Sequence, residues 1–377
     1  SHGVNAVSQV RGAYALAIVD ASRKSVFLAV DRFAVQTLCY CLDGQELSFS
    51  DRADCVEGRG NELDAQAIFD YLFFHMIRKV RRLPAGHGLL IDESGVREIR
   101  HWPLTFDEQH REPFPVARNT FRKLIRDSVV EEVSGHKRVG AFLSGGTDSS
   151  TVAGMLCEVT GAPAPSYSIG FEAEGYDEMG YARLAARHFG CEHHEYYVTP
   201  ADLVASIPAV AQHYDQPFGN SSALPAYYCA KMAKADGCTK MLAGDGGDEL
   251  FGGNSRYATQ RMFEFYHGIP RAIRRMIEPM CGDDSLVRRI PGLRQAAGYV
   301  RHSRVEMPDR LQSFNLIMRL DPATVLTADF LAQIDLAEPA AHMRGTWNEC
   351  KADSLINRML AYDWRYTLAD SERPKVR

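Results

Sequence analysis

The sequence lacks several features that would place it in a familiar class. It has no run of eighteen apolar residues, so no membrane-spanning helix is expected, and no signal-peptide pattern is visible at its start. Its nine cysteines form no C-x-x-C pair, which is typical of reduced thiols, and we expect a cytoplasmic protein. A net charge of -5 and a sequence pI of about 6.2 argue against nucleic acid as a partner.

Two well-known phosphate-binding loops are also absent from the main glycine turn, because neither G-x-x-x-x-G-K-[ST] nor G-x-G-x-x-G occurs there. Instead, a short apolar run at residues 139–143 has the length of a buried strand, and a helical pattern begins four residues later. A glycine turn between a strand and a helix presents backbone N–H groups to an anion such as a phosphate. A carboxylate beside a phosphate is repelled unless a divalent cation lies between them, so Asp148 in this turn predicts Mg²⁺.

A second loop, at residues 243–254, reads A-G-D-G-G-D-E-L-F-G-G-N and follows another short apolar run. It places three carboxylates, those of Asp245, Asp248 and Glu249, among five glycines. Such crowding costs roughly a kcal/mol or more per close pair at an intermediate dielectric constant, and a bound Mg²⁺ would relieve it. The pattern therefore favours a metal-binding loop over a plain turn.

The distribution of patterns along the chain predicts two domains. Residues 1–104 are rich in short alternating strands with one helix, and residues 105–117 are polar and proline-containing, as expected of a linker. From residue 139 onward, strands and helices alternate, which predicts an α/β fold with a doubly wound parallel sheet over residues 118–377. In such sheets ligands bind beyond the carboxyl ends of the strands, where both glycine-rich loops fall.

These motifs resemble those of one enzyme family. The run S-G-G-x-D-S-S resembles the pyrophosphate loop of the ATP pyrophosphatase superfamily, and the second loop is similar to S-G-E-G-x-D-E-L-F-x-G-Y of asparagine synthetases. The runs R-G-A-Y-A-L-A-I-V-D and R-R-L-P-A-G-H are similar to the later half of the glutaminase domain of asparagine synthetase-type amidotransferases, an N-terminal-nucleophile fold. Residues 1–104 are accordingly interpreted as a partial α+β glutaminase-like layer.

The resemblance implies an ATP-dependent, AMP- and pyrophosphate-forming amidotransferase. Such an enzyme adenylates a substrate carboxylate, here aspartate, and amidates it with ammonia derived from glutamine. The residues leave other acceptors open: a peptide side chain, a β-amino acid that cyclises on itself, or a sugar acid. A nucleotide-binding regulator without catalysis and an RNA-modifying sulfur transferase are alternatives of other classes, and a homodimer is one arrangement that the sequence leaves open.

The resemblance also implies the roles of individual residues. The residues expected to bind ATP are Leu143, Ser144, Gly145, Gly146, Thr147, Asp148, Ser149, Ser150, Ile169, Gly170 and Gly244. Asp148 and Asp248 are expected to hold Mg²⁺, and Asp245, Glu249 and Lys375 to act in catalysis. The residues expected near the acceptor are Asp177 and Glu178 of a Y-D-E run, Asp215 before a proline, and Asn220.

The start of the chain differs from the part of the family's glutaminase domain that releases ammonia from glutamine. In the family the glutaminase nucleophile is a cysteine at the mature N-terminus, whereas position 1 here is serine and the first half of that domain has no counterpart. These residues therefore do not support glutaminase activity, and free ammonia is the alternative donor. We expect that a preceding half is missing from the sequence, and that residues are also missing near Ile77-Arg78 and at the C-terminal end.

Overall fold

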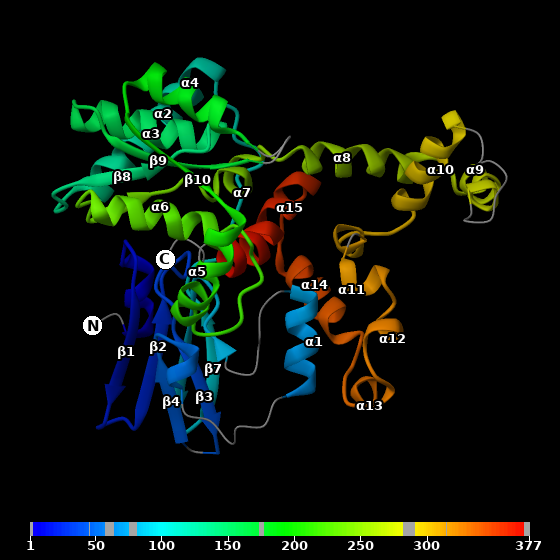
Figure 1. The fold of residues 1–377 in the computed structure, drawn as a ribbon. Coiled ribbons are helices and arrows are strands. Elements are labelled where there is room, and N and C mark those ends of the chain that lie inside the picture. The colour runs from blue at the N-terminus through cyan, green and yellow to red at the C-terminus, as the bar shows by residue number, and fades with distance from the viewer. Residues whose placement is uncertain are drawn as a thin grey trace. The chain divides into compact units, whose positions relative to one another are not determined.

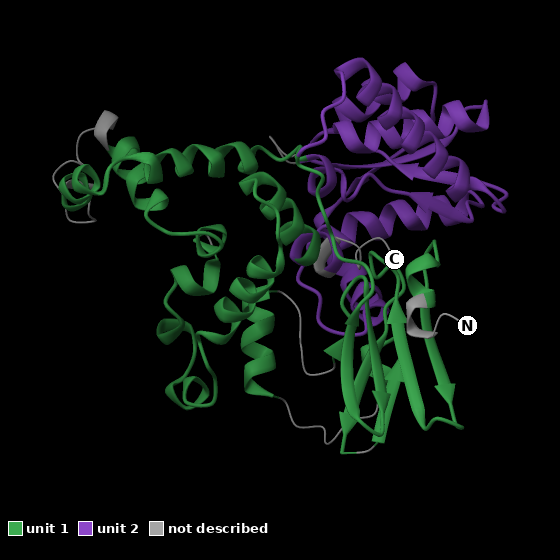
Figure 2. Cartoon of the chain, turned by 180° about the vertical axis from the view of Figure 1, so that it is seen from behind, with its two compact units in different colours: residues 1–108, 252–365 green, residues 109–251, 366–377 purple. Residues whose placement is uncertain are grey.

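The computed structural model of the chain describes residues 3–44, 46–56, 64–74, 81–172, 177–281, 291–313 and 315–372. It divides into two compact units, each built from two segments of the chain (Figure 2). Unit 1 comprises residues 1–108 and 252–365, and unit 2 comprises residues 109–251 and 366–377. The predicted discontinuity at Ile77-Arg78 and the candidate Lys375 lie outside the described residues.

Unit 2 contains the predicted parallel sheet. Its strands are β8 (Val139–Phe142), β9 (Pro165–Phe171), β10 (Glu192–Val198) and β11 (Lys240–Leu242). Their order is β10-β9-β8-β11, and all three pairings are parallel. The helices of this unit are α2 (Phe114–Val133), α3 (Thr147–Thr160), α4 (Met179–Phe189), α5 (Pro200–His213), α6 (Ala223–Ala235) and α7 (Gly247–Phe251).

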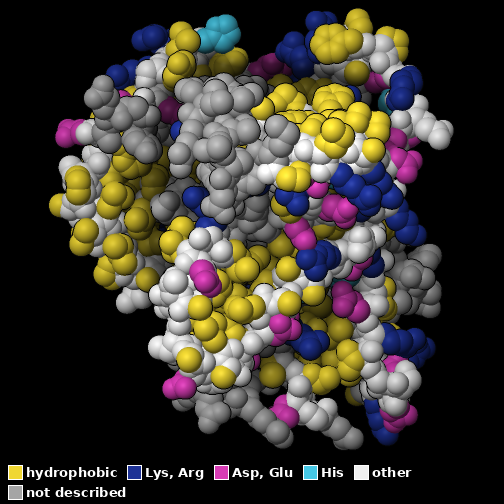
Figure 3. Space-filling model, turned by 90° about the vertical axis from the view of Figure 1, so that its right-hand side faces the viewer, with side chains coloured by type: hydrophobic (Ala, Val, Ile, Leu, Met, Phe, Trp, Pro, Cys, Tyr) yellow, Lys and Arg dark blue, Asp and Glu magenta, His cyan; other side chains and the backbone are white. Residues whose placement is uncertain are grey.

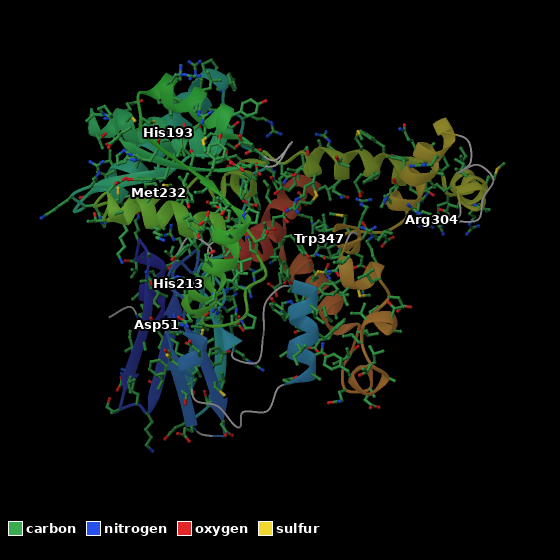
Figure 4. The ribbon with its side chains drawn as sticks, viewed as in Figure 1. Asp51, His193, His213, Met232, Arg304 and Trp347 are labelled. Carbon is green, nitrogen blue, oxygen red and sulfur yellow. The ribbon has the colours of Figure 1, made fainter. Side chains whose placement is uncertain are left out.

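Helices cover both faces of this sheet, which confirms the doubly wound fold (Figure 1). Side chains of successive strand residues point to opposite faces. Accordingly, Val139 and Ala141 of β8 pack in one core with residues of α2, α3 and α4. Phe142 packs instead in a second core with Tyr167 and with α6, on which Met232 lies (Figure 4).

The connection into unit 2 is shorter than the sequence predicts. The predicted linker covers residues 105–117, but α2 begins at Phe114. Pro113 is the N-cap residue and Pro115 lies in the first turn. Proline is tolerated there because the first N–H groups of a helix have no partner within the helix. The prolines that indicate a linker in the sequence therefore belong to the start of a helix.

The first part of unit 1 is a β layer whose described residues include one α-helix, α1 (Ala65–Phe74). Four antiparallel strands form one sheet in the order β1-β2-β6-β7, and three form another in the order β4-β3-β5. The strands are β1 (Ala15–Asp20), β2 (Ser25–Val30), β3 (Cys39–Asp43), β4 (Glu46–Ser50), β5 (Arg81–Arg82), β6 (His87–Asp92) and β7 (Gly95–Arg100). The predicted α+β character of this region is confirmed.

The second part of unit 1 is helical and belongs to the same compact unit as the β layer. Its α-helices are α8 (Ser255–Glu264), α9 (Arg271–Ile277), α10 (Pro291–Ser303), α11 (Leu316–Arg319), α12 (Pro322–Val325), α13 (Ala328–Leu331), α14 (Glu338–Glu349) and α15 (Leu355–Asp363). The carboxylate of Glu108 accepts hydrogen bonds from the N–H groups of Asp353 and Ser354, both at 2.8 Å, at the start of α15. The compact units thus group residues 252–365 with the N-terminal layer, and the predicted domain boundaries remain a prediction.

The helical part of unit 1 exposes several hydrophobic side chains, among them Met276, Leu316 and Leu320. Hydrophobic side chains lie interspersed with basic and acidic ones on the face drawn in Figure 3. In the described part of the chain, each helix is either too short or too polar to cross a membrane.

Candidate functional site

The first glycine loop joins β8 to α3 and is held closely by its neighbours. Gly145 has a φ of +86°, and a Cβ atom there would lie 2.4 Å from the backbone nitrogen of Ala182 in α4. The hydroxyl oxygen of Ser149 accepts a hydrogen bond from the Ser144 N–H at 3.2 Å and lies 2.9 Å from the Ser144 hydroxyl. The loop backbone therefore has a fixed course at the N-terminus of α3, where a helix attracts anions.

The second glycine loop packs directly on the first. A Cβ atom on Gly244 would lie 2.6 Å from the backbone nitrogen of Ser149, and one on Gly247 would lie 2.4 Å from the carboxyl carbon of Asp148. Only residues without a side chain allow this approach. Two motifs about a hundred residues apart in sequence thus meet beyond the carboxyl ends of β8 and β11.

The two loops bring the carboxylates of Asp148 and Asp248 together. Partial burial raises the pKa of Asp148, and the nearby negative charge of Asp248 raises it further. Both effects disfavour a charged Asp148 in the absence of a cation. Asp248 lies in the first turn of α7, which begins at Gly247.

Within the described ranges, no group of three or more His, Cys, Asp or Glu side chains is arranged to hold a metal ion. Mg²⁺ in nucleotide sites usually has only one or two carboxylate ligands, and phosphate oxygens and water complete its shell. Asp148 and Asp248 fit this kind of site, because their mutual repulsion would be relieved by one shared cation.

A cavity of about 270 Å³ lies beside these loops in unit 2. Its walls come from the ends of β8 and β9 and from α4 and α6, and five of the predicted residues line it: Leu143, Ser144, Ile169, Glu178 and Asp245. The remaining lining residues are Phe142, Tyr167, Ser168, Phe171, Met179, Ala182, Ser222, Pro225, Ala226 and Cys229. A largely apolar lining with a few polar groups is typical of small-molecule sites.

Hydrogen bonds fix the inner wall of this cavity. The Leu143 N–H donates to the Tyr167 carbonyl at 3.0 Å, and the hydroxyl of Ser168, which is almost fully buried, donates to the Leu143 carbonyl. A Cβ atom on Gly170 would lie 2.6 Å from the ring of Tyr197. Glycine at position 170 is therefore required by packing between β9 and β10.

The predicted acceptor residues are only partly brought together. Glu178 lines the cavity and precedes α4, whereas the carboxylate of Asp177 accepts hydrogen bonds from the Met179 N–H at 3.2 Å and the Tyr197 hydroxyl at 3.3 Å. The side-chain oxygen of Asn220 accepts a hydrogen bond from the Ser222 N–H at 3.0 Å, just before α6. Asp215 follows α5 and is half-buried. Asp177 and Asn220 thus have a local structural role.

The predicted catalytic residues differ in their surroundings. Asp245 is exposed at the rim of the cavity, while Glu249 lies in α7 and is only 9% exposed. A Cβ atom on Gly246 would lie 3.2 Å from a methyl group of Leu368, so the segment that leads toward residue 375 packs against the second loop. Ser150 lies in the first turn of α3, and its buried hydroxyl has no hydrogen-bond partner among the described residues.

Comparison with known proteins gives two family matches. The model described as "Asparagine synthase" matches residues 120–374, and the model described as "Glutamine amidotransferase domain" matches residues 1–102. A Methanocaldococcus jannaschii protein, provisionally named a glutamine-hydrolysing asparagine synthetase, is 30% identical over 72% of this chain and 55% of its own length. Asparagine synthetase 1 (glutamine-hydrolysing) of Bacillus subtilis is 27% identical over 72% of this chain and 44% of its own length.

The chain therefore spans about half the length of the curated relatives it matches. Among solved structures, the NMN synthetase of Francisella tularensis is 13% identical, with 68% of this chain and 96% of that chain covered and a TM-score of 0.29. A likeness this slight supports no conclusion about fold or function.

Proposed function

The chain belongs to the asparagine synthase family, and from this premise we propose that it is an ATP-dependent, AMP- and pyrophosphate-forming amidotransferase. We propose aspartate as the acceptor and glutamine-derived ammonia as the nitrogen donor. One observation carries the proposal: the two glycine loops and the apolar cavity beside them meet at one edge of the sheet. This arrangement supports a nucleoside in the cavity and its phosphates at the N-terminus of α3.

The proposed reaction has two steps. A carboxylate oxygen of the acceptor attacks the α-phosphorus of ATP, the bond to the β-phosphate oxygen breaks, and pyrophosphate leaves. The nitrogen of ammonia then attacks the carbonyl carbon of the adenylate, a proton is removed, and AMP leaves as the amide forms. The first step needs no base because the carboxylate is already ionised, so charge neutralisation and alignment dominate the catalysis.

The residues of the two loops supply these effects in the proposal. The N–H groups of the loop from Ser144 to Thr147 would bind phosphate oxygens, helped by the positive end of the α3 dipole. Asp148 and Asp248 would hold Mg²⁺, which, when bound, offsets negative charge that develops on the phosphate oxygens. The raised pKa of Asp148 supports this role, since a cation restores a stable charged carboxylate there.

The second step requires a base for the proton of the attacking ammonia. We assign this role to Asp245 rather than to Glu249, because Asp245 lies exposed at the cavity while Glu249 is largely buried in α7. We also assign Lys375 to the departing pyrophosphate, as the family resemblance implies. Glu178 is the residue that we assign to the acceptor or to the ribose, because it lines the cavity.

We further propose that the reaction takes place in the cytoplasm. The described cysteines are all free thiols, which fits a reducing compartment. The glutamine amidotransferase match over residues 1–102 supports glutamine as the natural nitrogen donor.

The test is acceptor-dependent exchange of labelled pyrophosphate into ATP, followed by product analysis with ammonium as the nitrogen donor. Ammonium bypasses glutamine hydrolysis, so the assay addresses the ATP-dependent half alone. The proposal expects exchange that requires aspartate and Mg²⁺, and AMP and asparagine in equal amounts. If a peptide, a β-amino acid or a sugar acid supported exchange and aspartate did not, that compound would replace aspartate as the proposed acceptor. ATP binding without exchange in the presence of any acceptor would refute the amidotransferase proposal.

A further inference from the structure

A second cavity, of about 400 Å³, lies within unit 1 between the β6–β7 hairpin and helices α14 and α15. All of its lining residues belong to unit 1, and none belongs to the cavity beside the glycine loops. Its volume is within the range of small-molecule sites. The proposed reaction gives this cavity no role.

The inner part of the cavity is aromatic. The rings of Trp102 and Trp364 meet edge to face with their centroids 4.8 Å apart, and the ring of Phe33 lies 5.2 Å from that of Trp364. Trp364 is only 7% exposed, and Leu104 and Pro84 add further apolar surface to the lining. This part suits an apolar group, because burying apolar surface against these rings is favourable and a polar group would lose its hydration.

The outer part of the cavity carries charges of both signs. The side chains of Glu98 and Glu349 are 57% and 66% exposed, and that of Arg100 is 37% exposed. An Nη atom of Arg100 lies 3.8 Å from a carboxylate oxygen of Glu349, and Nε2 of His87 lies 3.7 Å from one of Glu98. Both distances exceed that of a direct hydrogen bond. A ligand could therefore form hydrogen bonds with these side chains without first breaking a hydrogen bond within either pair.

Two arginines, Arg100 and Arg365, line the cavity together with His87. Burial lowers the pKa of His87 most strongly, a hydrogen bond with the Ala85 carbonyl and the charge of Glu98 oppose this effect, and the charges of the two arginines add to it. With His87 uncharged, the lining has two arginines and two glutamates of opposite charge close to the aromatic part.

We propose that this cavity binds a free α-amino acid with an apolar side chain, held as a zwitterion. The side chain would lie against Trp102 and Trp364, the carboxylate against the arginines, and the ammonium group against Glu98 and Glu349. An anion or a cation alone would satisfy one pair of charges and face repulsion from the other. Aspartate and glutamine, the substrates of the proposed reaction, have polar side chains that do not suit the aromatic part, so this ligand is a different molecule.

The binding test uses L-leucine as the probe, with equilibrium dialysis of the labelled amino acid as the primary measurement. Two analogues test the two charged groups of leucine separately: 4-methylpentanoate lacks the ammonium group and 3-methylbutylamine lacks the carboxylate. The proposal expects saturable leucine binding and at least tenfold weaker competition by either analogue. The proposal would be overturned if leucine binding did not saturate below its solubility limit. It would also be overturned if either analogue competed as strongly as unlabelled leucine.

Variants locate the bound leucine. Gly345 lines the cavity from α14, and a Cβ atom there would meet no atom within 4 Å, so Gly345→Leu is the variant chosen to fill the cavity. Gly345→Leu and Arg100→Gln should each weaken leucine binding at least tenfold. The matched control is Arg97→Gln on the same strand, because Arg97 pairs with Asp92 at 2.8 Å and does not line the cavity.

Tryptophan fluorescence gives an independent readout. The chain has three tryptophans, two of which line the cavity, while Trp347 lies on α14 (Figure 4) and packs against Arg358. Leucine should change the fluorescence of the wild type and of Arg97→Gln but not that of Gly345→Leu. ATP binding should be equal in all variants, which separates a failure here from a failure of the proposed function. Wild-type leucine affinity in folded Gly345→Leu and Arg100→Gln would refute the assignment.

Discussion

A Cβ atom on Gly247 would lie 2.4 Å from the carboxyl carbon of Asp148, so the two residues are in direct contact across the two glycine loops. Position 247 precedes Asp248, whose charge raises the pKa of Asp148. The absence of a side chain at one residue therefore allows two carboxylates to approach each other. Close placement of like charges costs stability in the empty protein and is expected where a cation binds.

Gly247→Ala is predicted to reduce ATP–pyrophosphate exchange by about 100-fold, because displacing a metal-binding carboxylate by an ångström has effects of that order. The added methyl group must push the Asp148 carboxylate away from its position. The matched control is Gly180→Ala in α4, where a Cβ atom meets nothing within 4 Å. The control should keep full exchange and gain up to about 1 kcal/mol of stability. Full exchange in Gly247→Ala would contradict the role of this contact.

Asp148→Asn is predicted to stabilise the nucleotide-free protein near pH 7. The pKa of Asp148 is raised in the folded chain by burial and by Asp248, so the folded state binds this proton more tightly than the unfolded state. The contribution of Asp148 to stability therefore falls as pH rises through the window between its ordinary and its raised pKa. Urea unfolding should show a higher midpoint for the variant at about pH 7 and a smaller difference at about pH 4.

Asp202→Asn in the same unit provides a control of opposite sign. Hydrogen bonds from the side chain and backbone of Thr199 lower the pKa of Asp202, which forms a capping box at the start of α5. Its stabilising effect is present above the ordinary pKa of aspartate and is lost as pH falls through the lowered value. Asp202→Asn should therefore lower the urea midpoint at about pH 7. If Asp148→Asn and Asp202→Asn shifted the urea midpoint in the same direction, the conclusion that the charged Asp148 destabilises the fold would be contradicted.

Ala226→Phe is predicted to raise the KM for ATP at least tenfold by filling the cavity beside the loops. Ala226 lines this cavity from α6, whereas Ala230, one turn later, is exposed. Ala230→Phe is the matched control and should leave the KM unchanged. The two are compared by steady-state kinetics of pyrophosphate release. If a folded Ala226→Phe variant had an unchanged KM for ATP, the nucleoside would not bind in this cavity.

Much of this site could be predicted because the relevant features are local. A short apolar run followed by Ser144-Gly145-Gly146 indicates a strand, a turn and a helix within a few residues, and parallel topology places all such turns at one edge. The clustering of Asp245, Asp248 and Glu249 is likewise visible in the sequence alone. Local patterns therefore suffice to bring Asp148 and Asp248 to the same edge.

Other parts of the structure depend on tertiary packing that no local pattern encodes. The face of α6 that carries Ser222, Ala226 and Cys229 opens onto the cavity, but its small residues are equally typical of a buried helix face. Glycine at position 170 is explained by the ring of Tyr197 on the next strand, which lies 27 residues away in sequence. The prolines at the start of α2 do not by themselves distinguish a linker from a first helical turn, because proline is common in both.

The central claim is that Asp148 and Asp248 hold one shared cation beside the nucleotide. Its most direct test is Mn²⁺ binding in the presence of a non-hydrolysable ATP analogue, followed by electron paramagnetic resonance. Titrations compare the wild type, Asp148→Asn, Asp248→Asn and the double variant. A shared cation predicts that each single variant loses most of the affinity and that the double variant loses little more, because interacting residues are not additive. Independent losses that add in the double variant, or wild-type affinity in either single variant, would contradict the claim.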